Sequence, residues 1–531
     1  MFDIIIRNGL LVDGTGAAAV TGDLGIQDGR ITVVGNLRDA PAETSIDAVG
    51  LVVAPGFIDI HTHSDLTLLV DPRGLSKIMQ GVTTDLIGHC GTSPFPVSAQ
   101  WGDLQRSQSS LGEHIDWNWT DLAGYRHTLH ERGVGMNVAP LVGHGSVRSS
   151  VVGFEDRPAS ADEVRAMQRL VAEAMDQGAF GLSTGLSLPP SAYGDTGELI
   201  ALCQAMAVYG NRIHACHMRG WSGLHLQAIA EVVEISRRSS VPGQLAHMAV
   251  NDPRHWGEAE ESIVICEQAV DAGIDVSFDV YPYAASSSGF SQCMPTWSQS
   301  GGRQALVQRL RDPDKRAGIR AAMETEGLFR GWPWLWDRLM VCAVDDERAK
   351  PCEGMTLQQA AEHLGMEPLD AALTLMDWDD GKMHIIFFYR TEEDMRTFLR
   401  HPFSMVGSDG LALMAGGVLG TGKPHPRSYG AAARVLGRYV RQEKVLTLED
   451  AVHKMSGKVA NRLGLTDRGR LAAGMMADVV VFDPETVIDR ATFERPHQYA
   501  TGIRWVLVNG RMVVRDGAHT DVLAGRVLEA N

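Results

Sequence analysis

Two histidines stand in a segment whose residue pattern is typical of a strand, Phe57–His63, which reads Phe-Ile-Asp-Ile-His-Thr-His. Alternate side chains of a strand point to the same face, so Asp59, His61 and His63 are expected to share one face. Two imidazoles on one face can bind a metal ion such as zinc. A single His-x-His pair is weak evidence in a chain with 19 histidines, so its position must be weighed as well.

Further metal-binding side chains follow other apolar, strand-like runs: Cys90, His217, His247 and Asp409. Imidazole, thiolate and carboxylate groups together suit one or two zinc ions. Each residue alone has a simpler explanation, such as a buried free cysteine or an aspartate that caps a turn. Because neighbours on a regular strand face opposite ways, only one of His89 and Cys90 can face such a site. His214 and His217 can both face it only if their strand bends.

Strand-like and helical stretches alternate from about residue 55 to residue 465, which predicts a parallel sheet with crossover helices. We therefore predict an α/β protein with a (β/α)8 barrel, in which the candidate ligands lie at the strand ends where barrel enzymes carry their chemistry. This region is longer than a usual barrel, so we expect an insertion at about 291–348. Its four tryptophans either line a substrate lid or pack the insertion onto the barrel: Trp297, Trp332, Trp334 and Trp336.

Both ends of the chain carry hairpin signals with Asn-Gly or Asp-Gly turns, at Asp3–Val12, Leu24–Val34 and Trp505–Val514. We expect residues 1–54 and 466–531 to form one small β domain together, with the barrel at 55–465. Two domains fit a chain of 531 residues.

The composition describes an ordinary globular protein, with 44% hydrophobic and 21% charged residues. A net charge of −17 without a basic face argues against nucleic acid as a partner. The seven cysteines are odd in number and widely spaced, which favours a reducing cytoplasm. We expect no signal peptide and no membrane span, and the sequence predicts no particular oligomeric state.

Several longer motifs resemble the amidohydrolase superfamily and, within it, the N-acyl-D-amino-acid deacylases (D-aminoacylases). They run almost from end to end of the chain: Ala54–His63, Gln80–Thr84, His89–Gly91, Asn137–His144, Gly181–Leu186, His217–Arg219, Tyr281–Tyr283, Val406–Gly410, His425–Arg427 and Ala477–Asp483. The resemblance implies a (β/α)8 barrel beside a β-sandwich built from both termini.

The resemblance also implies a ligand set. Most superfamily members bridge two metals with a carboxylated lysine on the fourth strand, but Gly181–Leu186 contains no lysine. The deacylases use a cysteine on the second strand, which is Cys90 here. The resemblance thus places a tight zinc site at Cys90, His217 and His247, and a second, weaker site at His61, His63 and Asp409.

This arrangement implies metal-assisted hydrolysis of an amide bond in a small molecule. Zinc lowers the pKa of a bound water towards about 7 and polarises the carbonyl. Asp409 is expected to act as general base towards the water and then as general acid towards the leaving amine.

One family feature is missing. Relatives that bind a free amino-acid carboxylate generally carry a lysine two residues after the second zinc-binding histidine, where this chain has Ala249. Candidate substrate contacts remain, because arginine pairs with carboxylates and tyrosine is a neutral donor. They are Tyr193, Arg219, Tyr281, Tyr283 and Arg427, with His144 as a possible contact to the oxyanion. Each of these side chains can equally have a structural role, such as a salt bridge or a packed ring.

Two other functions compete with linear-amide hydrolysis. A cyclic-amide hydrolase of the hydantoinase or dihydroorotase kind shares the barrel and its metal chemistry, but those relatives usually rely on the lysine that this chain lacks. A metal-free barrel that serves only as a binding subunit is the alternative from another class. The filled ligand positions argue against that alternative.

Overall fold

A computed structural model describes residues 1–109, 111–220 and 225–530. Two parallel sheets form the centre of the molecule, one with the order β6-β7-β8 and the other with the order β17-β13-β12-β11-β10-β9. A parallel β-bridge between Thr62 and Gly410 connects the two sheets beyond the ends of β6 and β17. In this bridge the N–H of His63 donates to the carbonyl of Gly410, and the N–H of Asp409 donates to the carbonyl of His61. The strands are β6 (Phe57–Asp59), β7 (Val82–Ile87), β8 (Asn137–Pro140), β9 (Val142–Gly143), β10 (Gly181–Gly185), β11 (Ile213–His217), β12 (Gly243–Leu245), β13 (Val276–Val280) and β17 (Ser404–Val406).

Every residue of these strands is buried, because helices connect successive strands and cover the sheets. The helices are α1 (Thr67–Val70), α2 (Leu75–Ile78), α3 (Gly102–Ser107), α4 (Leu122–Arg132), α5 (His144–Val151), α6 (Ala161–Asp176), α7 (Thr196–Ala207), α8 (His225–Ser239), α9 (Ala259–Asp271), α14 (Glu392–Arg400), α15 (Arg427–Arg434), a π-helix (Val435–Gln442), α16 (Leu448–Met455) and α17 (Gly457–Arg462). Among the described residues, no helix is both long and apolar enough to cross a membrane. All seven cysteines are buried and free.

The two ends of the chain meet in one nine-stranded sheet of order β21-β20-β19-β18-β5-β1-β2-β3, with β4 paired to β1. Its strands are β1 (Phe2–Leu11), β2 (Val20–Gln27), β3 (Arg30–Gly35), β4 (Ala42–Asp47), β5 (Val52–Pro55), β18 (Val479–Phe482), β19 (Ile503–Val508), β20 (Arg511–Arg515) and β21 (Ala518–His519). After β21 the chain leaves this sheet and runs along the barrel region, where Leu528 donates to the carbonyl of Val138. The C-terminal segment therefore belongs to two regions of the molecule.

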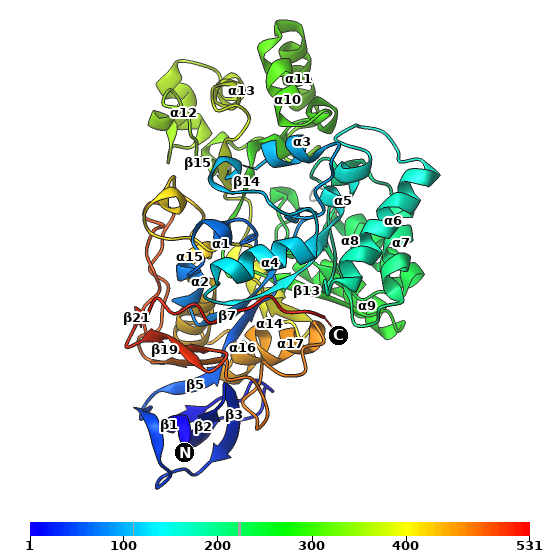
Figure 1. Ribbon diagram of the computed structural model, residues 1–531. Coiled ribbons are helices and arrows are strands. Elements are labelled where there is room, and N and C mark those ends of the chain that lie inside the picture. The colour runs from blue at the N-terminus through cyan, green and yellow to red at the C-terminus, as the bar shows by residue number, and fades with distance from the viewer. Residues whose placement is uncertain (110, 221–224, 531) are drawn as a thin grey trace.

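An extra region lies between β13 and α14, and Figure 1 shows it at the opposite end of the molecule from β1–β3. It comprises β14 (Ser286–Gly289), α10 (Arg303–Arg311), α11 (Pro313–Glu326), β15 (Leu339–Ala343), α12 (Leu357–Leu364), α13 (Pro368–Trp378) and β16 (His384–Phe387). The sheet β14-β16-β15 joins its start to its end. The region extends beyond the predicted insertion at 291–348, because it also includes β14, α12, α13 and β16.

A buried ion pair connects the terminal sheet with the barrel region. Asp478 pairs with Arg468, and both side chains are almost fully buried. The Asp478 carboxylate also accepts hydrogen bonds from the backbone N–H of Asn509 and from the side chain of Asn137 on β8. One carboxylate thus satisfies donors from three separate segments.

We predict that Asp478→Ala lowers the free energy of unfolding by about 3 kcal/mol, because it leaves Arg468 buried with only the half-exposed Asp467 as a partner. Asp516→Ala is the control, since Asp516 pairs with Arg504 at the surface, and it should cost less than about 1 kcal/mol. Urea denaturation measures both changes. Equal losses in the two variants would contradict the structural role of Asp478.

Candidate metal centre

The six candidate metal ligands come together although they lie up to 348 residues apart in the chain. All stand at or just after the carboxyl ends of parallel strands, which meet on one side of the sheets. They are His61 and His63 after β6, Cys90 after β7, His217 at the end of β11, His247 after β12 and Asp409 after β17.

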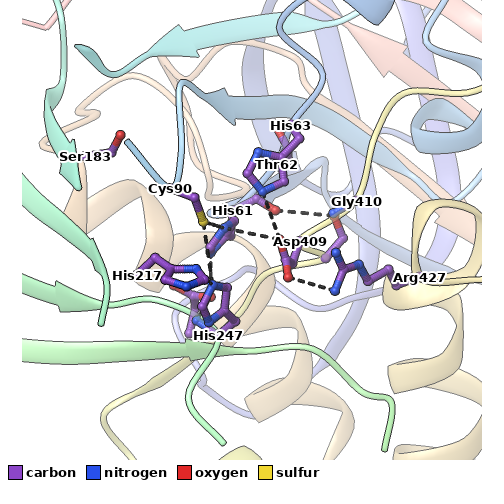
Figure 2. A network of polar contacts seen from close by, with 12 residues as sticks. His61, Thr62, His63, Cys90, Ser183, His217, His247, Asp409, Gly410 and Arg427 are labelled. Atoms are coloured by element: carbon purple, nitrogen blue, oxygen red, sulfur yellow. Dashed lines mark hydrogen bonds and ion pairs between the residues drawn. The ribbon is translucent and has the colours of Figure 1, made fainter. Parts of the chain in front are cut away.

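Figure 2 shows these side chains pointing toward one another. The Cys90 sulfur lies 3.4 Å from Nε2 of His61 and 3.6 Å from Nε2 of His247. Nε2 of His247 is in turn 2.9 Å from Nδ1 of His217. On the other side, Oδ1 of Asp409 lies 3.0 Å from Nε2 of His63 and 3.4 Å from Nε2 of His61.

Two groups of donor atoms result, in each of which all atoms lie within 4.8 Å of one another. One group is Cys90, His217 and His247, and the other is His61, His63, Cys90 and Asp409. Sulfur with two imidazole nitrogens is a zinc-type donor set, and the second group adds a carboxylate. The donor chemistry therefore fits zinc at either group, with Cys90 shared.

Three of the candidate ligands have a left-handed backbone conformation, which directs their side chains toward the other donor atoms. Cys90 has φ +52°, His247 +39° and Asp409 +52°, which residues other than glycine rarely adopt. Such a turn after a strand breaks the alternation of side chains. On β10, the Ser183 hydroxyl holds the turn at Cys90 by accepting from the N–H of Gly91 and donating to the carbonyl of Gly88.

Of the two ambiguous pairs of neighbours, Cys90 and His217 are the members that belong to the donor groups. The His89 ring stacks on the ring of His61, with centroids 4.0 Å apart, and is outside both donor groups. His214 lies 3.0 Å from the Thr184 hydroxyl and is also outside them.

Asp279 on β13 contacts two of the candidate ligands, and the sequence analysis did not select it. Its Oδ1 accepts from Nδ1–H of His61 at 3.0 Å and from the backbone N–H of His247 at 2.8 Å. A carboxylate that accepts from Nδ1–H leaves Nε2 of the same ring free to bind a metal. An acidic residue within the apolar strand Val276–Val280 was the signal that could have revealed it.

A second buried carboxylate, that of Asp59, fixes the backbone beside the ligands. Its Oδ1 accepts from the N–H of His61 and from the N–H of Ser408, while Oδ2 accepts from Lys77 at 2.8 Å. Lys77 also donates to the Ser408 hydroxyl. Because Ser408 precedes Asp409, this network joins the two segments that carry His61 and Asp409.

The charges around the site favour metal-binding protonation states at Cys90, Asp409 and His247. At His61 and His63 burial lowers the pKa, but the neighbouring carboxylates and Cys90 outweigh it, and they raise the pKa of His61 well above its usual value and that of His63 to about 9. Burial opposes ionisation of Cys90, but His61, His217 and His63 hold the pKa of its thiol well below its usual value. Burial also opposes ionisation of Asp409, yet the Arg427 guanidinium and the neighbouring histidines hold the pKa of this carboxyl well below its usual range. Burial lowers the pKa of His247, which keeps its ring neutral. A thiolate, a carboxylate and a neutral imidazole are the forms that bind metal.

A cavity of about 610 Å³ opens onto both donor groups. Its walls include His63, Cys90, His217, His247 and Asp409 together with residues of the extra region between β13 and α14. Those residues include Ser287, Gln299, Arg303, Phe329, Trp332 and Phe387. The extra region therefore forms part of a substrate-sized pocket above the candidate metal centre.

Comparisons with known proteins agree with the geometry of the candidate metal centre. The sequence profile described as "Amidohydrolase family" matches residues 44–514. The chain belongs to the amidohydrolase family. It is thereby a metal-dependent hydrolase rather than a metal-free binding subunit.

Among its amidohydrolase relatives, the D-aminoacylase of Alcaligenes xylosoxydans xylosoxydans is 36% identical over 99% of this chain and 97% of the relative. A solved N-acyl-D-glutamate deacylase of Bordetella bronchiseptica, complexed with zinc and a phosphonate inhibitor, is 32% identical with a TM-score of 0.83 over the whole of both chains. A solved D-aminoacylase described for its binuclear metal centre is 34% identical, again with a TM-score of 0.83 over both full chains. A D-hydantoinase structure, 15% identical with a TM-score of 0.55 over 100% of this chain and 99% of that one, shares the fold alone.

The candidate substrate contacts of this amidohydrolase lie in different places. Of the six candidate substrate contacts, Arg427 alone is among the described residues that line the cavity. Its guanidinium pairs with Oδ2 of Asp409 at 2.8 Å (Figure 2). Tyr281 is buried beside this arginine, with its ring centroid 4.8 Å from the guanidinium carbon. Tyr283 points to Asp489, 3.3 Å from its hydroxyl.

The other three candidates have structural partners. His144 lies between Glu198 and the Ser191 hydroxyl, at 2.8 and 2.7 Å, and is fully buried. Tyr193 donates to a backbone carbonyl in the extra region. Arg219 pairs with Glu231 and lines a separate cavity of about 130 Å³.

We predict that Asp279→Ala weakens zinc binding about 10-fold to 100-fold while the fold is retained, because His61 loses its Nδ1 acceptor and His247 its backbone acceptor. Competition with a chromogenic chelator measures the affinity. Asp271→Ala, at an exposed carboxylate in the preceding helix, is the control and should bind zinc as wild type does. Wild-type affinity in Asp279→Ala would refute the role of this residue.

Proposed function

We propose that this amidohydrolase removes the acyl group from N-acyl-D-amino acids by hydrolysis of a linear amide bond. The observation that carries the proposal is the convergence of Cys90 with His217 and His247 beneath a substrate-sized cavity. The full-length relatives described as D-aminoacylase and N-acyl-D-glutamate deacylase support the substrate class.

The proposed ligands of a tight zinc ion are Cys90, His217 and His247, and those of a second, weaker ion are His61, His63 and Asp409. When bound, zinc supplies Lewis-acid polarisation of the amide carbonyl and lowers the pKa of water, which makes a nucleophile available near neutral pH. We propose that these residues belong to a (β/α)8 barrel at 55–465, beside a β-sandwich at 1–54 and 466–531. The eight-strand parallel order, with β8 and β9 counted as one strand, supports this division.

Asp409 is the proposed general base and general acid. Its carboxylate takes a proton from water as the oxygen–carbon bond forms, and it gives that proton to the amine nitrogen as the carbon–nitrogen bond breaks. Arg427 supports the first of these roles, because its ion pair with Oδ2 keeps the carboxyl ionised and leaves Oδ1 toward the histidines.

The sequence of strand β10 and the contacts of its Ser183 side chain argue against the cyclic-amide alternative. This strand reads Gly-Leu-Ser-Thr-Gly, and its Ser183 side chain is committed to the turn at Cys90. A carboxylated lysine therefore has no equivalent there. The low identity to the D-hydantoinase structure agrees with this preference.

Asp409→Asn is expected to retain zinc at the Cys90 group and to lower kcat by about 100-fold to 10,000-fold, because an amide cannot accept the proton. Steady-state kinetics on N-acetyl-D-methionine, with zinc content measured on the same preparation, tests this. A variant with near-normal kcat would remove Asp409 from the mechanism.

A substrate panel tests the proposed activity itself. With zinc added, N-acetyl-D-amino acids should be cleaved at least 10-fold faster, in kcat/KM, than their L-enantiomers, and hydantoins should not be cleaved. The released amine measures the first two reactions, and loss of ultraviolet absorbance measures the third. Cleavage of hydantoins without cleavage of any linear amide would favour the cyclic-amide alternative.

A further inference from the structure

Arg390 lies in the wall of the same cavity as the candidate metal ligands, and the sequence analysis did not select it. It follows β16 and precedes α14, where the extra region returns to the barrel. Its Nε donates to the side chain of Asn251, another wall residue, at 2.7 Å. Its guanidinium carbon lies 4.4 Å from the ring centroid of Tyr281. These contacts hold the guanidinium in one position.

No carboxylate of the described residues lies within ion-pair distance of Arg390, unlike the neighbouring Arg427 and Arg434. Arg427 pairs with Asp409 at 2.8 Å, and Arg434 pairs with Asp489 at 3.0 Å. Burial and the nearby charge of Arg427 lower the pKa of the Arg390 guanidinium, but an arginine stays protonated at neutral pH. A half-buried cation without a carboxylate partner is incompletely compensated, so the position favours binding of an anion.

Arg427 is already occupied. One terminal nitrogen holds the Asp409 carboxylate, and the other donates to the backbone carbonyl of Ser287 at 3.3 Å. An incoming anion would compete with Asp409 for Arg427, whereas at Arg390 it meets a cation whose one hydrogen-bond partner among the described residues is a neutral amide. The Tyr281 ring lies beside both guanidiniums and keeps them in place.

We propose that Arg390 is the residue that binds the free carboxylate of the substrate and thereby selects acids over their neutral amides. This inference rests on the proposed deacylase function and specifies it. It also accounts for the binding of a carboxylate in a chain with Ala249 at the position of the family's lysine, since the charge is supplied by a different segment. Asn251 is the positioning residue that orients Arg390.

The test compares N-acetyl-D-methionine with N-acetyl-D-methioninamide in the zinc-loaded enzyme. Wild type should prefer the acid. In Arg390→Gln, kcat/KM for the acid should fall by about 30-fold or more, the factor expected for loss of a buried ionic hydrogen bond, while the value for the amide changes less than about threefold. Arg390→Lys should recover most of the activity on the acid, because it restores the charge.

Arg338→Gln is the matched control. Arg338 also stacks on an aromatic ring, that of Trp256 at 5.2 Å, and donates to the carbonyl of Phe388, but it is outside the described cavity wall. It should leave the values for both substrates unchanged. Equal losses on the acid and the amide in Arg390→Gln would overturn the proposal, as would unchanged activity on the acid.

Calorimetry separates this inference from the proposed function. D-Methionine should bind the zinc-loaded wild type more tightly than D-methioninamide does, and Arg390→Gln should abolish that difference. If wild type and Arg390→Gln show the same difference, Arg390 does not bind the carboxylate. Selective binding that depends on Arg390, with no hydrolysis of any linear amide by wild type, would instead reject the deacylase function and retain the anion site.

Discussion

The shared hydrogen bonds of the Asp279 carboxylate are the constraint on which the candidate metal centre depends. One buried oxygen accepts from the ring of His61 and from the backbone of His247, which belong to different donor groups. It sets the tautomer of one ring and the backbone turn at the other. The distances from Cys90 to both histidines follow from these two positions, so that a sulfur can serve either group.

Several buried charges near this centre form hydrogen bonds or ion pairs with specific partners. Lys77 and Asp59 connect the segments of His61 and Asp409, and Arg427 holds the far oxygen of Asp409. Such pairs are costly to bury and costly to break, which makes the surrounding backbone resistant to rearrangement. Arg390 departs from this pattern because no carboxylate of the described residues pairs with it. A rigid polar centre beside a cation without a carboxylate partner suits the proposed binding of a substrate with a negative charge.

Periodicity in the sequence was sufficient to predict the parallel α/β architecture. It could not choose between His89 and Cys90, because the choice depends on a left-handed turn that strand alternation does not contain. Asp279 and Arg390 were missed since neither belongs to a motif, and their roles arise from neighbours more than 30 residues away. His144 has a motif, yet Glu198 and Ser191 engage both nitrogens of its ring.

We propose that Cys90 and histidines from distant strand ends bind one zinc ion. X-ray absorption at the zinc edge of the wild-type protein, loaded with one equivalent of zinc, tests it most directly. We predict one sulfur neighbour at about 2.3 Å and imidazole nitrogens at about 2.0–2.1 Å, with the sulfur signal lost in Cys90→Ala. A shell of nitrogen and oxygen neighbours without sulfur in the wild type would contradict the account.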